Sequence, residues 1–355
     1  MNNWLKAAAL AAIVSLLICP AGMAAKAKPK PKAPVKKPAA VKAPPKTPHV
    51  VLGTTQLSGE NAQLGTVYTL GKSSPMNITL RSAEYTVEAV RIGDQTYAPS
   101  AEEKLLVLHL TYHNPQKGEQ FVRWDSFGFT IVDPKDQNHD GLKDLGTEKD
   151  SASYSMSMKP AQKTDVFGVM VVPAAGEMPK LIIKSSDELV LRYDLHGKVK
   201  GLPALYADPA DKTGATALAK ITATAGTYYP IGMFSFKLNK VEYSSETKMG
   251  DNDLDEGQKF LVVSFSLKNT SASQQFFRWD SLTNKLIDVD GVEVARCSTD
   301  VFQASKNNSF SNNIQPGQEM NFRYIYKVPN DTDLKTLAIA EGDGRTFEFD
   351  ISGTK

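Results

Sequence analysis

Alternating apolar and polar residues mark two stretches of the chain as strands with one buried face. Apolar side chains recur at every second position in both, at Leu106, Leu108, Leu110 and Tyr112 and again at Leu261, Val263, Phe265 and Leu267. A period of two is that of a β-strand, whose successive side chains point to opposite faces of a sheet. The positions between them differ between the two stretches, since His109 and Thr111 align with Ser264 and Ser266. We therefore expect the apolar face to be the core side in both stretches.

The two strands belong to an internal repeat. Residues 104–133 and 259–288 align without a gap at a constant offset of 155, and each contains the element Phe-x-Arg-Trp-Asp-Ser. Shorter matches extend the repeat on both sides, for example Glu84-Tyr85 with Glu242-Tyr243, Pro173 with Pro329 and Asp194 with Asp350. A repeat of this length predicts two copies of one domain.

Both copies have the pattern of an all-β fold. No stretch shows a sustained helical period, and short β-type runs alternate with Gly, Pro, Asn and Asp. This pattern is typical of immunoglobulin-like β-sandwiches, and each copy is long enough to bury its own core. We expect two tandem sandwiches, one over residues 50–205 and one over 225–355, joined by a connector at 206–224.

The first residues predict an export signal. Lys6 precedes an apolar run from Ala7 to Ile18, which is too short to span a bilayer, and small residues follow up to Ala24. We expect a signal peptide over residues 1–24, and a mature chain without a membrane span that is periplasmic, cell-surface or secreted. Cys19 raises a lipoprotein signal as the alternative, but Ile18 is bulky where that processing needs a small residue.

Residues 25–49 predict a disordered Lys/Pro-rich arm. They hold eight lysines, seven prolines and no acidic residue, so they have too little apolar surface to offset the entropy of ordering. We expect a semi-rigid spacer. The alternative is a polycationic arm that contacts anionic envelope polymers or lipid head groups, and the two roles are compatible.

The charge of the folded body differs from that of the whole chain. The chain carries 41 basic and 39 acidic residues, for a net charge of +2. Without Lys6 and the eight arm lysines, 32 basic residues face 39 acidic ones, or about −7. An acidic body argues against nucleic acid as a partner, because phosphate binding needs a basic face. Removing the signal peptide leaves Cys297 as the one cysteine, which we expect to be a half-buried small hydrophobe.

The order of short motifs in the second copy resembles a known family. A strand ends in Leu267-Lys268-Asn269, another ends in Leu286-Ile287-Asp288, and the copy closes with Gln315-Pro316-Gly317-Gln318 and Tyr326-Lys327-Val328-Pro329. This order is similar to that of the secreted bacterial immunoglobulin-like modules grouped as DUF4352. The first copy departs from it, with Ala161 where the family usually has glycine. The resemblance implies fold and export, and it implies no catalytic residue.

The Phe-x-Arg-Trp-Asp-Ser element is the most distinctive motif of the repeat. In an extended strand Trp124 points away from Phe121, Arg123 and Asp125. We expect Trp124 and Trp279 to fill the two cores while the arginine and aspartate pair locally, since a buried Trp is common in such sandwiches. The alternative is a recognition patch formed by Arg123, Trp124, Arg278 and Trp279, because Trp and Arg are favoured at the centres of interfaces.

Two acidic loops are candidate calcium sites. Oxygen ligands at positions one, three, five and nine, with Gly141 at position six, suit a calcium loop at Asp136, Asn138, Asp140 and Asp144. Position twelve is Thr147 instead of the usual glutamate, so any affinity would be weak. A weaker candidate is the loop with Asp251, Asp253 and Asp255. The alternative for both loops is an ordinary solvated turn.

Other metal and catalytic motifs are few. Met156 and Met158 share a predicted strand face and suit copper(I), although such a pair is more often core. His109 and His113 would lie roughly 13 Å apart on a strand, too far for one metal. The chain has no HExxH, GxSxG, CxxC or phosphate-loop motif. We expect an exported, non-catalytic protein that binds or assembles with an envelope protein or polymer, with periplasmic metal binding as the alternative.

Overall fold

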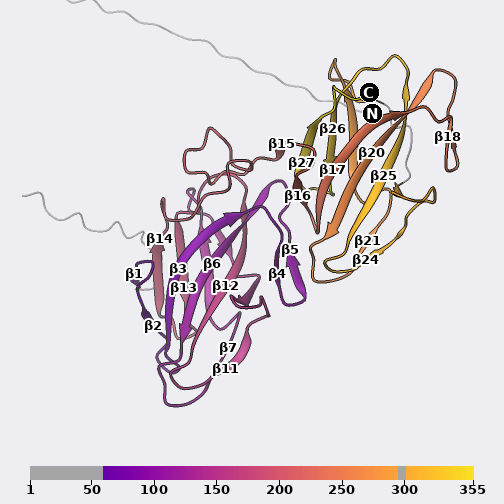
Figure 1. Ribbon diagram of the computed structural model, residues 1–355. Coiled ribbons are helices and arrows are strands. Elements are labelled where there is room, and N and C mark those ends of the chain that lie inside the picture. Colours follow the sequence, from indigo (N-terminus) through magenta and orange to yellow (C-terminus); the bar gives the residue numbers. More distant parts are fainter. Residues whose placement is uncertain (1–58, 295–300) are drawn as a thin grey trace, which may run out of the picture. The chain divides into compact units, whose positions relative to one another are not determined.

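The computed structural model describes residues 59–294 and 301–355. The predicted signal peptide, the predicted arm and Cys297 lie outside the described residues. The regular secondary structure of the described part is entirely β, arranged as two sandwiches (Figure 1), which confirms the expected fold class. Nowhere in residues 59–294 and 301–355 is there a helix with the length and apolarity needed to cross a membrane.

The first sandwich is built from two five-stranded sheets. One sheet has the order β1 (Glu60–Ala62), β14 (Val190–Asp194), β13 (Lys180–Lys184), β8 (Gly128–Val132) and β9 (Asn138–Asp140). The other has the order β10 (Asp144–Thr147), β12 (Lys163–Pro173), β6 (Glu103–His113), β3 (Met76–Thr86) and β2 (Tyr68–Leu70). Two small ribbons complete it, β7 (Gln120–Arg123) with β11 (Ser155–Met158) and β4 (Val90–Ile92) with β5 (Gln95–Tyr97).

The second sandwich repeats this topology, except that among the described residues its first sheet has four strands and none that corresponds to β9. One sheet has the order β15 (Lys220–Ala223), β27 (Thr346–Asp350), β26 (Leu334–Ala340) and β22 (Thr283–Asp288). The other has the order β16 (Tyr228–Ile231), β17 (Phe234–Ser244), β20 (Gln258–Asn269), β25 (Glu319–Pro329) and β23 (Val301–Gln303). The ribbons are β21 (Gln275–Phe277) with β24 (Asn312–Ile314) and β18 (Lys248–Met249) with β19 (Asn252–Asp253).

Matching details show that the two sandwiches are copies. The first strand of each pairs in parallel with the last, β1 with β14 and β15 with β27. The register of β3 against β6 shifts between Leu80 and Ser82, and that of β17 against β20 shifts between Leu238 and Lys240. β15 lies inside the segment 206–224 expected as a connector, because its pairing with β27 makes it the first strand of the second sandwich.

The apolar face predicted for the central strands is the core side. Leu106, Leu108, Leu110 and Tyr112 of β6 are buried, and so are Leu261, Val263, Phe265 and Leu267 of β20. The opposite face is also covered near the start of β6, where Leu105 and Val107 pack against Ile92 of the β4–β5 hairpin. The hairpin thus adds a small second core outside the sheet, which strict alternation would not predict.

Lys104 and Lys259, which are identical in the aligned repeats, make similar contacts in the two sandwiches. The ammonium of Lys104 is completely buried and donates to the carbonyls of Ala174 (3.0 Å), Gly176 (2.5 Å) and Ala215 (2.5 Å), 4.5 Å from the centre of the Tyr85 ring. In the second copy Lys259 lies 4.0 Å over the ring of Tyr243. Three acceptors and an aromatic face partly offset the desolvation of the Lys104 cation, although burial still lowers the pKa of its ammonium group to about 8. The bond to Ala215 ties the connector to the first sandwich.

Candidate functional site

The Phe-x-Arg-Trp-Asp-Ser element forms the same tight turn in both sandwiches. In the first, the amide of Ser126 donates to the carbonyl of Arg123 (3.1 Å), and the amide of Arg123 donates to Oγ of Ser126 (2.9 Å). The Arg123 guanidinium pairs with Asp125 across the turn. Arginine and aspartate therefore pair locally, as expected from the sequence.

The second turn repeats these contacts. The amide of Ser281 donates to the carbonyl of Arg278 (3.1 Å), and the amide of Arg278 donates to Oγ of Ser281 (3.0 Å). The Arg278 guanidinium binds Asp280 through Nε (2.5 Å) and Nη2 (2.8 Å), a fork that holds the turn closed. Each turn, with the phenylalanine before it, is called an aromatic turn below: Phe121 to Ser126 and Phe276 to Ser281.

The tryptophans do not fill the cores, so that expectation was wrong. Trp124 is 45% exposed and Trp279 is 39% exposed, while the phenylalanines before them, Phe121 and Phe276, are 59% and 53% exposed. The reason is local: β7 ends at Arg123 and the chain turns there, so strand alternation no longer applies to Trp124. Val122 and Phe277 are the residues of this element that enter the cores.

The chemistry of an aromatic turn is that of a recognition surface. It presents two large apolar rings, one of which carries a ring N–H, beside an arginine whose charge is already paired. Aromatic rings bury much area with few rotatable bonds, and Trp with Arg is the typical composition of an interface centre. The aspartate of each turn is paired with its arginine, and the groups left at the surface are mainly aromatic rings.

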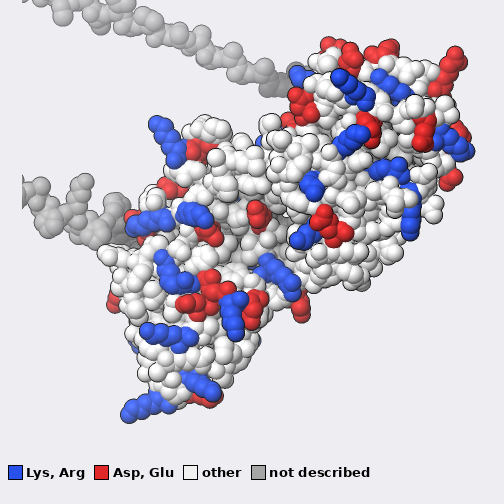
Figure 2. Space-filling model, in the orientation of Figure 1, with Lys and Arg blue, Asp and Glu red and all other residues white. Residues whose placement is uncertain are grey.

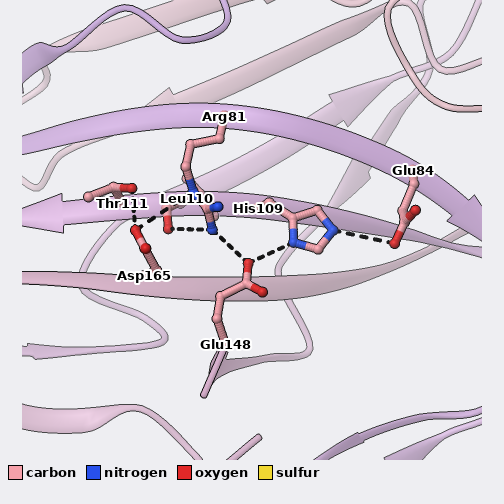
Figure 3. Close-up of polar contacts among 7 residues, drawn as sticks. All are labelled: Arg81, Glu84, His109, Leu110, Thr111, Glu148 and Asp165. Atoms are coloured by element: carbon pink, nitrogen blue, oxygen red, sulfur yellow. Dashed lines mark hydrogen bonds and ion pairs between the residues drawn. The ribbon is translucent and has the colours of Figure 1, made fainter. Parts of the chain in front are cut away.

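A second cluster of polar groups lies on the outer face of the first sandwich (Figure 3). Glu148 accepts from Nη2 of Arg81 (2.6 Å) and contacts Nδ1 of His109 (2.7 Å), while Nε2 of His109 lies 3.4 Å from Glu84. Lys200 is 2.9 Å from the other oxygen of Glu84 and, as its main hydrogen-bond donor, lowers the pKa of that carboxyl. Arg81 occupies the bulge of β3, which aims its side chain at this face.

The outer-face cluster is a network of ion pairs and offers no metal site. Glu84 and Glu148 meet opposite nitrogens of the His109 ring, so the three groups do not converge on one point. Within residues 59–294 and 301–355 no group of three His, Cys, Asp or Glu side chains has an arrangement that could hold a metal ion. Acidic and basic residues are also interspersed on the face drawn in Figure 2, which is typical of a solvated surface.

The first acidic loop is organised as a hairpin between β8 and β9. Asp133, which precedes the predicted ligands, accepts from the amides of Gln137 (2.9 Å) and Lys135 (2.8 Å), and the Gln137 bond chiefly lowers the pKa of its carboxyl. Asp136 pairs with Lys180 (2.6 Å). Asp144 is buried and accepts from the amide of Leu145 (2.7 Å). Two of the four predicted ligands are thus turned to different partners, and calcium at this loop stays a prediction.

The remaining metal candidates are also dispersed. Asp253 pairs with Lys248 (3.3 Å) and Asp255 with Lys327 (3.6 Å). Met158 is fully buried in the core, whereas Met156 is 36% exposed, although the sequence predicted one shared face. Copper at this pair therefore has no support from burial and stays a prediction.

Comparison with known proteins finds a family model that is similar to the second sandwich. Residues 225–346 match the family model described as a domain of unknown function, DUF4352, which confirms the resemblance in the second copy. No curated protein matches the chain.

Several solved structures are similar to part of the chain. One is an uncharacterized β-sandwich protein from Clostridium difficile, with 17% identity over 37% of this chain and 95% of that one and a TM-score of 0.30. Another is the yjhA protein of Bacillus subtilis, with 16% identity over 36% and 98% of the two chains and a TM-score of 0.26. A third is a conserved hypothetical protein from Bacillus anthracis, with 13% identity, coverage of 35% and 93% and a TM-score of 0.26.

Proposed function

We propose that this tandem, whose second module is of the DUF4352 kind, is an exported, non-catalytic binding or assembly protein of the cell envelope. Its contact surfaces are the two aromatic turns, and its partner is an envelope protein or polymer. The apolar run from Ala7 to Ile18 and the Lys/Pro-rich arm support the envelope as its location.

The repeated presentation of exposed aromatic residues carries this proposal. Arginine, aspartate and serine supply hydrogen bonds and ion pairs that close each turn, and a phenyl ring can take no part in such bonds. Both copies nevertheless place a phenylalanine and a tryptophan there, each more than a third exposed. Exposed aromatic pairs are unfavourable in water, which makes a partner that covers them the simplest physical account.

The energy available from these rings is sufficient for binding. Covering one pair removes on the order of 200 Å² of apolar surface, worth roughly 5 kcal/mol at about 25 cal/mol per Å² before the costs of association. Two turns that engage one extended partner would gain further through effective concentration. The alternative of a metal-binding protein has no comparable support, since Asp136 and Asp144 are engaged elsewhere.

Sedimentation with envelope fractions tests the proposal. The chain beginning at Ala25 should co-sediment with envelopes, and the Trp124→Ala/Trp279→Ala variant should lose at least tenfold in apparent affinity. Each single variant should lose less, because one turn remains. Val289→Ala/Val292→Ala is the matched control, since both valines are exposed outside the turns, and it should bind normally. Equal binding by the tryptophan variant and the control would refute the role of the turns.

A further inference from the structure

A small polar hollow adjoins the first aromatic turn. Its volume is about 180 Å³, and Phe121 and Ser126 of the turn line one side of it. The opposite walls come from the β2–β3 loop and from the loop after β13. We call it the serine pocket, after its lining residues Ser73, Ser74, Ser126, Ser185 and Ser186.

The serine pocket depends on a longer hairpin in the first sandwich. Leu70 pairs with Met76 there, which leaves five residues in the loop, whereas Ile231 pairs with Phe234 in the second sandwich and leaves two. In the second sandwich the carboxylate of Glu341 presses on this shorter turn, since a Cβ on Gly232 would lie 1.2 Å from its Oε2. That oxygen accepts from the amide of Met233 (3.1 Å). A carboxylate therefore lies directly against the shorter turn of the second sandwich.

The walls of the serine pocket are fixed before any ligand arrives. Asp187 accepts from the amides of Lys72 and Ser73 (3.2 Å) on one wall and from Oγ of Ser185 (2.5 Å) on the other. These bonds, the Ser185 hydroxyl first, lower the pKa of Asp187 to about 2, so the carboxylate is ionised at neutral pH. Gln120 donates to the carbonyl of Ser74 (2.8 Å) and holds the same loop. A preformed site loses little entropy on binding.

The lining selects a ligand class. Serine hydroxyls both donate and accept, and Oε1 of Gln120, a residue of the lining, is a buried acceptor without a hydrogen-bond partner. The buried Met76 and Val122 and the largely exposed Phe121 supply the apolar part of the lining. The one ionised group in the lining is the Asp187 carboxylate, which disfavours anions.

We propose that the serine pocket binds one neutral sugar residue of an envelope glycan, with Phe121 against its apolar face. A sugar ring combines hydroxyls at its edge with an apolar C–H face, which matches serines beside an aromatic ring. Drug-sized ligands occupy roughly 300–1,000 Å³, so this smaller hollow suits a single unit of a longer polymer. The inference rests on the proposed function and specifies the partner as a glycan.

Binding of defined oligosaccharides tests the inference. The chain beginning at Ala25 is titrated with neutral tetrasaccharides of glucose, mannose and N-acetylglucosamine, and with tetragalacturonate as an anionic probe. At least one neutral probe should bind below 10 mM, and tetragalacturonate at least tenfold more weakly. Ser186→Tyr should weaken the neutral probe at least tenfold by filling the pocket, because Ser186 is exposed and lines it. Ser245→Tyr, at an exposed serine of the second sandwich, should bind as the wild type does.

The outcomes separate this inference from the proposed function. Phe121→Ala should also weaken the neutral probe while leaving the fold intact, since that side chain is mostly exposed. No binding of any neutral probe at 10 mM, or equal binding of tetragalacturonate, would overturn the glycan inference. Tryptophan-dependent sedimentation with envelopes would then still support the aromatic turns and point to a protein partner. If co-sedimentation with envelopes also did not depend on the two tryptophans, both proposals would be refuted.

Discussion

At the scale of single residues, the burial of Glu341 makes the stability of the fold depend on pH. Its carboxyl lies against the turn at Gly232, and burial raises its pKa from 4.5 to about 7 despite the hydrogen bond from Met233. Between pH 4.5 and about pH 7, the folded state therefore keeps the Glu341 carboxyl protonated, whereas the unfolded state has released this proton. Stability contributed by the protonated form is full below about pH 4.5 and is lost as pH rises through 7.

We predict that Glu341→Gln removes this loss of folding stability at higher pH. The amide keeps an acceptor for Met233 and carries no charge, so the variant should exceed the wild type by up to about 3 kcal/mol at pH 8. Urea unfolding at pH 4.5 and pH 8 measures the difference. Glu246→Gln, at an exposed position, is the control and should follow the wild type. Parallel pH profiles for Glu341→Gln and the wild type would contradict the assignment.

Trp124 and Trp279 show where residue-level reading from sequence fails. The alternation of apolar positions correctly identified Leu106, Leu108 and Leu110 as core, because a strand continues through all three. It misplaced the tryptophans because β7 ends one residue before Trp124. The Ser126 hydroxyl that closes the turn is the signal that could have located this end, since serine readily bonds nearby backbone.

At the scale of elements, the repeat was the strongest guide. Equal spacing predicted equal strands, and apart from β9 the structure has the same sheet order and the same bulge in both copies. The serine pocket could not be predicted in this way. It arises from three extra residues in one hairpin and from a contact between loops more than a hundred residues apart, which no local pattern contains.

The β8–β9 loop is the element at which calcium binding is predicted and can be tested. Binding would require Asp136 to leave Lys180, so we predict weak affinity of about 10⁻⁴ to 10⁻³ M, the range of extracellular sites. At ten times the dissociation constant, calcium should stabilise the chain by about 1.4 kcal/mol. Thermal melts with 10 mM calcium and with chelator measure this. Asp140→Ala should abolish the shift and Asp253→Ala should keep it; no shift in the wild type would leave an ordinary hairpin turn.

At the scale of the whole molecule, buried polar contacts join the repeats. Arg345 is 5% exposed, and its guanidinium donates to the carbonyls of Ser100 (3.0 Å), Glu103 and Leu218 (3.1 Å). The equivalent position in the first copy, 156 residues earlier, is Leu189, so the first sandwich has no arginine there to make the same contact. The two copies therefore share a fold and an aromatic turn but differ in what surrounds them, which fits one tandem binding protein with two unequal modules.

Tryptophan fluorescence tests the central claim directly. The full sequence has three tryptophans, and a chain that begins at Ala25 keeps only Trp124 and Trp279, one in each aromatic turn. If a partner covers the turns, adding envelope fractions should shift the emission to shorter wavelength and reduce quenching by acrylamide, because both rings leave water. Trp124→Phe and Trp279→Phe variants report each turn separately. Envelope binding with unchanged emission and unchanged quenching would contradict the account, because the partner would then contact some other surface.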